Sequence, residues 1–131
     1  MVRDDARLNI EMGRLELAES ELARASKMLP EDPEVQYLTG RLKLEKAKKA
    51  KDKLIVDKLN RDAAAAFREA VRLDPSRPGP HRELGLLAYR SGDGATACTE
   101  FRKYLELAPS ADDAQSLRDY LTELKRDGKC P

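Results

Sequence analysis

One short pattern occurs three times in this 131-residue chain, and it constrains the fold more than any other feature. An alanine is followed by a large apolar residue, a small or aromatic residue and a proline, at steps of four, three and five positions. The copies are Ala18, Leu22, Ala25 and Pro30; Ala63, Phe67, Ala70 and Pro75; and Ala97, Phe101, Tyr104 and Pro109. The prolines lie 45 and then 34 residues apart, and a 34-residue period is typical of stacked helical hairpins.

The spacing of this pattern predicts one face of an amphipathic helix, because residues four and seven positions apart lie on the same side. In the second copy, Ala63 and Ala70 would let a neighbouring helix approach closely while Phe67 fills the gap, and Pro75 would end the helix. Capping oxygens combined with proline or early carboxylates predict helix starts at residues 32–34, 76–80 and 110–113. Turns are predicted at Gly13 and at residues 91–94.

Composition favours an all-α fold. Charged residues make up 37% of the chain and aromatic residues only 5%, and the apolar side chains are mostly leucine and alanine, which favour helices. The formal net charge of +1 creates no overall field that would attract nucleic acid or an anionic membrane. Neither a signal peptide nor a membrane-inserted segment is expected, so the compartment stays open between the cytoplasm and a soluble part of a cell-envelope protein.

The two cysteines are expected to be unpaired thiols. Cys98 and Cys130 lie 32 residues apart and match no zinc-ligand or CxxC spacing. Cys98 falls inside a predicted helix, whereas Cys130 falls in a terminal tail that is expected to fray.

The third unit carries the pattern that names a family. Leu84 and Gly85, followed by Ala97, Phe101 and Pro109, stand in the register of the W-x2-L-G-x2-Y, A-x3-F and P positions, so the chain resembles a tetratricopeptide repeat protein. The resemblance implies one domain built as an α-solenoid of antiparallel helix pairs in a right-handed superhelix. Its expected parts are repeat units at residues 1–32, 33–77 and 78–110 and a capping helix at residues 111–127. The first unit begins in mid-helix, so the chain is expected to be part of a longer protein or to have a short first helix.

The second unit contains 45 − 34 = 11 extra residues between Gly40 and Ala63. We expect both of its helices to be about one and a half turns longer, with the turn near residues 50–53. Residues 41–58 carry eight basic and three acidic side chains, a net charge of +5. A solvated hairpin is the favoured interpretation, and an acidic partner or anionic surface is the alternative. The lysines that would form this basic surface are Lys46, Lys48, Lys49, Lys51 and Lys53.

The family resemblance also implies a concave groove lined by the first helix of each pair. Arginine and tyrosine are side chains that anchor peptides through bidentate contacts and rigid stacking area. Gly79, Glu83 and Leu38 stand where a chaperone-tail clamp would need lysine, asparagine and arginine, which argues against that subclass. The residues expected to line the groove are Arg7, Ile10, Glu11, Tyr37, Arg41, Leu44, Arg82, Leu86, Tyr89 and Arg90.

Catalysis finds little support in the sequence. The single histidine, His81, occupies the tryptophan position of the repeat and is expected to pack between helices, and one histidine cannot supply both a metal site and its general base. We therefore expect no enzyme activity, no cofactor and no metal site, and the scarcity of aromatics and arginine in the basic segment argues against nucleic acid. The sequence predicts a module that binds a peptide or a helix of another protein. Alternatives are an assembly or accessory domain of a bacterial cell-envelope protein of protease or pilus type, and homo-oligomerisation through the N-terminal repeat edge.

Overall fold

The chain is all-helical, as the sequence predicts. The structure is a computed structural model that describes residues 2–131, none of which lies in a strand. It divides into two compact units, the first ending at Asp74 and the second running from Pro75 to Pro131. The helices are α1 (Val2–Glu11), α2 (Leu15–Met28), α3 (Pro33–Lys49), α4 (Lys53–Leu73), α5 (Pro78–Ser91), α6 (Gly94–Leu107) and α7 (Ala114–Arg126).

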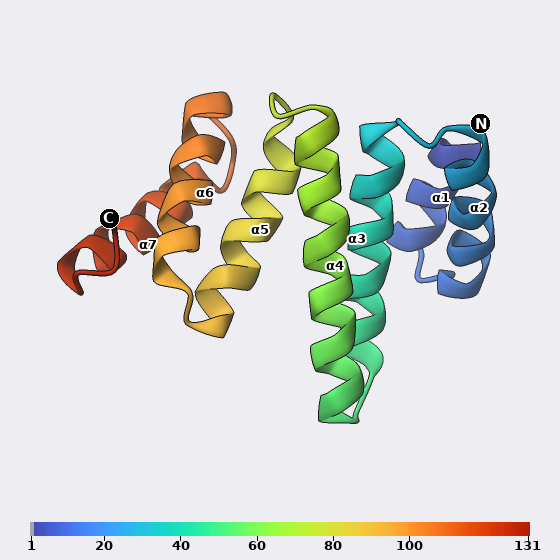
Figure 1. Ribbon diagram of the computed structural model, residues 1–131, viewed down its shortest axis with the longest axis horizontal. Helices are drawn as coiled ribbons and strands as arrows, with labels where there is room; N and C mark the ends of the chain where they lie inside the picture. Colours follow the sequence, from blue (N-terminus) through green and yellow to red (C-terminus); the bar gives the residue numbers. More distant parts are fainter. Residues whose placement is uncertain (1) are drawn as a thin grey trace. The chain divides into compact units, whose positions relative to one another are not determined.

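Consecutive helices pair into hairpins within each unit. In the first unit α1 packs against α2 and α3 against α4, with further contacts from α3 to both α1 and α2 (Figure 1). In the second unit α5 packs against α6, and α6 in turn packs against α7. Each unit therefore contains the antiparallel helix pairs that the repeated pattern predicts.

The repeated residues form the cores of these hairpins. In each of the three copies, the three pattern residues that precede the proline are buried. In two hairpins the large residue meets a glycine of the partner helix: a Cβ atom on Gly40 would lie 2.5 Å from the Phe67 ring, and one on Gly85 would lie 2.5 Å from the Phe101 ring. Because real Cβ atoms do not come that close, each ring sits in a notch that only glycine leaves open. We call these contacts the glycine notches.

Two kinds of helix end recur along the chain. The second helices α2, α4 and α6 each stop just before a proline of the repeat, which cannot continue a helix. In contrast, α1, α5 and α7 end at a glycine with positive φ, namely Gly13, Gly92 and Gly128. At all three, the residue after the glycine donates its N–H back to a carbonyl of the last turn, which is a Schellman motif. By this criterion α7 ends as the first helices α1 and α5 do, whereas α3 ends at Ala50 without a glycine.

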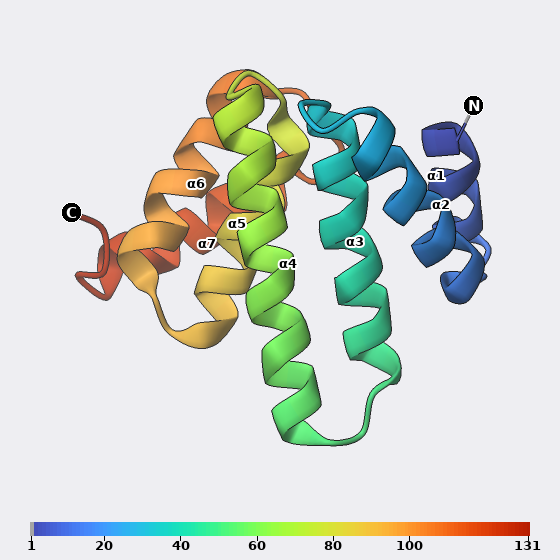
Figure 2. The same cartoon turned by 45° about the vertical axis from the view of Figure 1, so that its right-hand side comes forward.

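The insertion lengthens the second hairpin, but not equally. The turn lies at residues 50–52, as predicted, where Asp52 caps α4 by accepting from the N–H groups of Leu54 and Ile55. However, α3 has 17 residues and α4 has 21, against 14 for both α5 and α6, so most of the added length lies in α4. The prediction of equal extension is therefore wrong. Figures 1 and 2 show the turn end of this hairpin reaching past α1 and α2.

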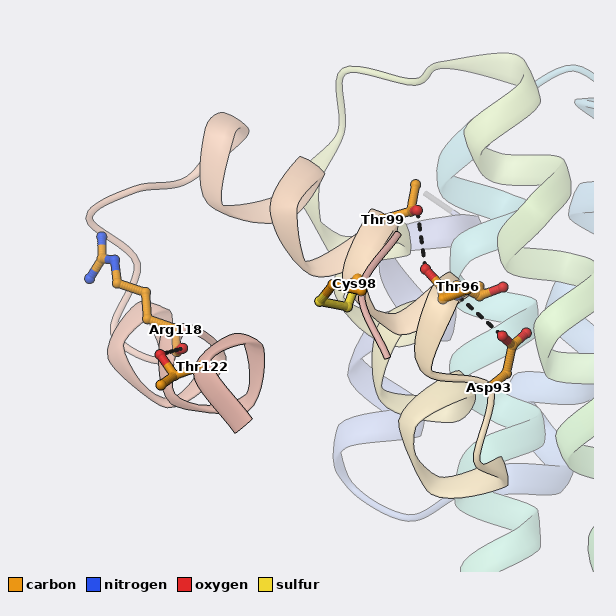
Figure 3. Close-up of a disulfide and its surroundings, with 8 residues drawn as sticks. Asp93, Thr96, Cys98, Thr99, Arg118 and Thr122 are labelled. Atoms are coloured by element: carbon orange, nitrogen blue, oxygen red, sulfur yellow. Dashed lines mark hydrogen bonds between the residues drawn. A yellow bond between two sulfur atoms is a disulfide. The ribbon is translucent and has the colours of Figure 1, made fainter. Parts of the chain in front are cut away.

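The prediction of two unpaired thiols is also wrong, because Cys98 and Cys130 form a disulfide with a Cα–Cα distance of 5.5 Å. Gly128 reverses the chain after α7, and the Lys129 N–H donates to the Leu124 carbonyl at 2.9 Å. The tail then lies on α6, where a Cβ on Gly94 would meet the Lys129 side chain at 2.6 Å. Figure 3 shows the sulfur–sulfur bond at Cys98 on α6, beside the Asp93 cap that accepts from the Thr96 N–H.

Candidate partner-binding surfaces

The sequence-predicted groove residues fall on α1 and α3 of the first unit and on α5 of the second. These are the first helices of their hairpins. Buried residues of the repeat pack each of them against its second helix, and a glycine notch adds to this packing at α3 and at α5. We call the residues on α1 and α3 the first-unit face and those on α5 the second-unit face.

On the first-unit face the structure brings some predicted residues to the surface and buries one. Ile10 is only 3% exposed and belongs to the hydrophobic core, so its side chain is not available at the surface. Glu11 is exposed, and the exposed Arg7 forms an ion pair with the buried Glu34 at 2.8 Å. That pair joins α1 to the first turn of α3. Arg7 is therefore engaged within the chain.

Three predicted residues of α3 remain partly accessible. The Tyr37 ring lies against Phe67 with centroids 5.8 Å apart and interplanar angle 51°, and it is half-buried. Arg41 and Leu44 are also half-buried and lie one and two turns further along the same helix. Arg41 makes no ion pair within residues 2–131, so its charge is available to a ligand. This strip combines an aromatic ring, a cation and an aliphatic side chain.

On the second-unit face, Arg82 is held by acidic neighbours. Its guanidinium donates to Asp113 at the start of α7 and to Glu83 at 2.5 Å. The Tyr104 hydroxyl donates to the other oxygen of Asp113 at 2.6 Å, so this carboxylate joins α5, α6 and α7. Burial alone would raise the pKa of Asp113, but the Tyr104 hydroxyl and the Arg82 guanidinium together hold the pKa below its ordinary value of 3.8. Arg82 is thus a structural link.

Aromatic side chains form the middle of the second-unit face. Tyr89 of α5 and Tyr120 of α7 have ring centroids 4.7 Å apart, and Phe101 lies beneath them at 6.5 Å and 5.8 Å. The Tyr89 hydroxyl donates to Glu123 at 3.0 Å, and this hydrogen bond is the main reason that the pKa of Tyr89 is raised. Leu86, also half-buried, packs against the same core. The two tyrosines are therefore positioned before any partner arrives.

Sequence reasoning misses the contribution of α7 to this face. The helical pattern places Tyr120 on the apolar side of the capping helix, and it does not single out Glu123 or Asp113 for the site. The signal that could have found them is Gly128 after α7, because a glycine also follows the first helices α1 and α5. Arg90 is exposed at the end of α5 and makes no ion pair within the described residues. It is the accessible cation of the second-unit face.

His81 packs between helices, as predicted, and is 4% exposed. Its Nδ1 lies 2.7 Å from a Glu100 carboxylate oxygen, and its Nε2 lies 2.8 Å from the Pro75 carbonyl oxygen. Because both ring nitrogens are occupied within the unit, neither is positioned for an external substrate. Across residues 2–131 there is no group of three or more side chains that could hold a metal ion.

The predicted basic surface lies on the α3–α4 hairpin. Lys46 pairs with Glu19 of α2, Lys48 pairs with Glu45 at 3.0 Å, and Lys53 pairs with Asp57 at 3.3 Å. Lys49 and Lys51 are exposed and form no ion pair with any described residue. The part of the chain that the structure describes contains no helix long and apolar enough to cross a membrane.

Comparison with known proteins identifies the fold. Residues 59–112 match the family model for the tetratricopeptide repeat. A solved structure of a thermophilic TPR protein from Thermus thermophilus is similar over 98% of this chain, with a TM-score of 0.77 and 19% sequence identity. The chain spans 64% of that protein, and no curated protein matches it. The chain is thus a protein of tetratricopeptide repeat fold, with the family's sequence pattern recognised over residues 59–112.

Proposed function

We propose that this chain is a non-catalytic interaction module that binds a peptide or a helix of another protein on the first-helix faces. The tetratricopeptide repeat fold implies a protein–protein interaction module. We further propose that repeat units at residues 1–32, 33–77 and 78–110, with α7 as a terminal first helix, belong to one such domain. The observation that carries the proposal is the second-unit face, where Leu86, Tyr89 and Tyr120 are partly exposed yet already fixed.

The chemistry of the partner follows from what these faces leave available. Tyrosine rings and leucine offer apolar area whose ordering was settled during folding, so less entropy is lost on binding. Among the arginines expected to line these faces, Arg41 and Arg90 have no ion pair within the described residues, whereas Arg7 and Arg82 are already engaged. We therefore infer that the preferred ligand carries an apolar anchor and a carboxylate.

A random-peptide display library selected against the immobilised chain tests this proposal. Enriched peptides should combine acidic and large apolar residues. Arg90→Glu should weaken binding of an enriched peptide, because it reverses the charge that faces the carboxylate. Arg68→Glu is the matched control, because Arg68 is an exposed arginine on the second helix α4. Equal loss in both variants, or selected peptides without acidic residues, would contradict the proposed face.

Self-association is the second candidate function, and exposed side chains at the N-terminal hairpin favour it. Leu8 and Met12 are each 53% exposed and lie one helical turn apart, and Leu17 is 49% exposed. A repeat edge of this kind can stack on another repeat. Light scattering after size-exclusion chromatography measures the mass of the wild type and of the Leu8→Ser, Met12→Ser variant. A dimer that the variant converts to a monomer supports assembly, whereas a wild-type monomer leaves peptide binding as the proposal.

The disulfide favours a role in an oxidising compartment, such as the accessory domain of a cell-envelope protein. Disulfides persist in secreted and periplasmic proteins and are rare in reducing cytosol. Cys98 and Cys130 form such a bond within the second unit. Alkylation of the chain in its native cells, followed by mass spectrometry, should find both cysteines protected. Complete labelling of both thiols would reject this localisation.

A further inference from the structure

The tip of the α3–α4 hairpin presents a pair of aliphatic side chains to solvent. Leu54 is 79% exposed and Ile55 is 53% exposed, and both lie in the first turn of α4. Asp52 holds this turn by accepting from their N–H groups at 2.8 Å and 3.3 Å. The connection from Lys49 to Lys53 is short, so Leu54 and Ile55 lie on an ordered helix end and not on a long loop.

Four lysines lie close to these aliphatic side chains along the chain. Lys48 and Lys49 end α3, Lys51 lies in the turn and Lys53 begins α4, with Asp52 as the acidic residue among them. The side chains of Lys48 and Lys53 remain 71% and 87% exposed despite their ion pairs with Glu45 and Asp57. Pairs this exposed release their lysines at small cost. The tip therefore combines two exposed aliphatic side chains with several positively charged ones.

The end of the hairpin can also reach a surface without obstruction from its own unit. Buried residues of α3 end at Leu42 and those of α4 begin at Ala63, so no residue of the intervening segment is fully buried. Figure 2 shows this segment continuing past α1 and α2 to the turn. Contact made by the tip would therefore leave the packing of the first unit unchanged.

We propose that this tip binds the surface of a bilayer containing anionic lipids, with Leu54 and Ile55 entering the boundary between headgroups and acyl chains. Basic side chains attract such a surface and aliphatic side chains gain by leaving water at its boundary, so the combination matches both chemistries. Nucleic acid explains the lysines but gives the aliphatic pair no role, and no aromatic residue lies at the tip to stack on bases. The hairpin lies at the interface and does not span the bilayer.

Sedimentation with vesicles tests the proposal with the full chain. The wild type should bind vesicles of phosphatidylcholine and phosphatidylserine at low salt and should not bind vesicles of phosphatidylcholine alone. High salt should weaken the binding, because it screens the lysines. Leu54→Ser with Ile55→Ser should weaken it by about tenfold or more. Lys51→Glu with Lys53→Glu should weaken it at least as strongly.

Matched control variants separate this tip from general surface properties. Met28→Ser removes an apolar side chain that is 68% exposed beside the start of α3, about 25 Å along that helix from the tip. Lys27→Glu with Lys125→Glu makes the same charge change on other exposed positions. Both controls should bind within about twofold of the wild type, and far-UV circular dichroism checks that every variant is folded.

A spectroscopic test uses the fact that the chain contains no tryptophan. Leu54→Trp should show a blue shift in emission when phosphatidylserine vesicles are added, whereas Met28→Trp should not. Absence of vesicle binding by the wild type would overturn the proposal. Vesicle binding that depends on the lysines but not on Leu54 and Ile55 would also overturn it. So would the finding that Leu54 and Ile55 are needed to bind an oligonucleotide or an acidic protein but not to bind vesicles.

Discussion

The α3–α4 and α5–α6 hairpins use the same central contact but have different lengths. Gly40 receives Phe67 and Gly85 receives Phe101, in both cases with no room for a Cβ. The helices α5 and α6 have 14 residues each, whereas α3 has 17 and α4 has 21. The comparison teaches that the glycine notch sets the register of a hairpin, and that length can be added beyond it without disturbing the buried pattern.

The two hairpins also differ in what holds their outer parts. The end of α3–α4 is held by exposed ion pairs such as Lys46–Glu19 and Lys58–Asp62. The α5–α6 hairpin is instead fixed to α7 by the Asp113 carboxylate and by the disulfide between Cys98 and Cys130. Exposed ion pairs contribute little to folding free energy, so the outer part of α3–α4 should tolerate change that α5–α7 does not.

The largest effects should come from removing the rings that fill the two notches. Phe67→Ala and Phe101→Ala should each lower the free energy of unfolding by about 3–5 kcal/mol, because both rings are fully buried. Urea denaturation followed by circular dichroism measures the change. Leu54→Ala at the hairpin tip is the control and should stay within about 0.5 kcal/mol of the wild type, since that side chain is exposed. A small effect at either phenylalanine would break the equivalence of the two hairpins.

Removal of the disulfide should be the next largest change and should act on the second unit. The bond closes a loop with a sequence separation of 32, for which the chain-entropy relation gives about 3.7 kcal/mol. Cys98→Ser with Cys130→Ser should therefore lower the free energy of unfolding by a few kcal/mol and should raise hydrogen exchange in α6 and α7. Exchange in α3 and α4 is the internal reference. Equal acceleration in both units would show that the bond does not act locally.

Filling a notch should cost less than emptying it. Gly40→Ala and Gly85→Ala should each destabilise the chain by about 1–3 kcal/mol, because the new Cβ forces the facing ring to move and this exceeds the helix-propensity gain of alanine. Combining Gly40→Ala with Phe67→Leu should recover part of the loss, and a double-mutant cycle measures the coupling. Additive effects of the two substitutions would mean that the cost of Gly40→Ala does not come from its contact with the Phe67 ring.

Much of this fold could be predicted from the sequence, because helical pairing depends on a local pattern. Ala63, Phe67 and Ala70 indicate a buried face by their spacing alone, and Pro75 indicates its end. The unequal extension of α3 and α4 could not be predicted, since the lysine-rich segment has no Gly or Pro to mark how its length divides. The sequence does offer Asp52 as a capping oxygen near this turn, and the structure confirms that it caps α4.

The candidate faces were less accessible to sequence reasoning, because it cannot see what each side chain contacts. Ile10 occupies a first helix and yet belongs to the core. The sequence predicts that Arg82 faces a ligand, but Arg82 donates to Asp113, a residue 31 positions away. The disulfide was missed for a related reason, since its formation depends on how Gly128 turns the tail back onto α6.

The smallest effects distinguish the acidic residues that hold the two hairpins. Burial raises the pKa of Asp113, but hydrogen bonds from Tyr104 and Arg82 outweigh burial and leave this pKa lowered. The pKa of Glu19 is lowered chiefly by a hydrogen bond from Lys46. A carboxylate whose pKa is lower in the folded state than in the unfolded state stabilises the fold at pH values above its unfolded-state pKa. This contribution is lost as the pH falls through the folded-state pKa. Asp113→Asn should lower the free energy of unfolding by about 1–2 kcal/mol at neutral pH, whereas Glu19→Gln should lower it by at most about 0.5 kcal/mol because its ion pair is exposed.

Urea titrations at pH values from neutral to below 3.8 should show the difference between wild type and Asp113→Asn shrinking toward zero. A difference that persists in acid would assign the effect of Asp113 to packing, and an equal loss for Glu19→Gln would remove the distinction between the two hairpins.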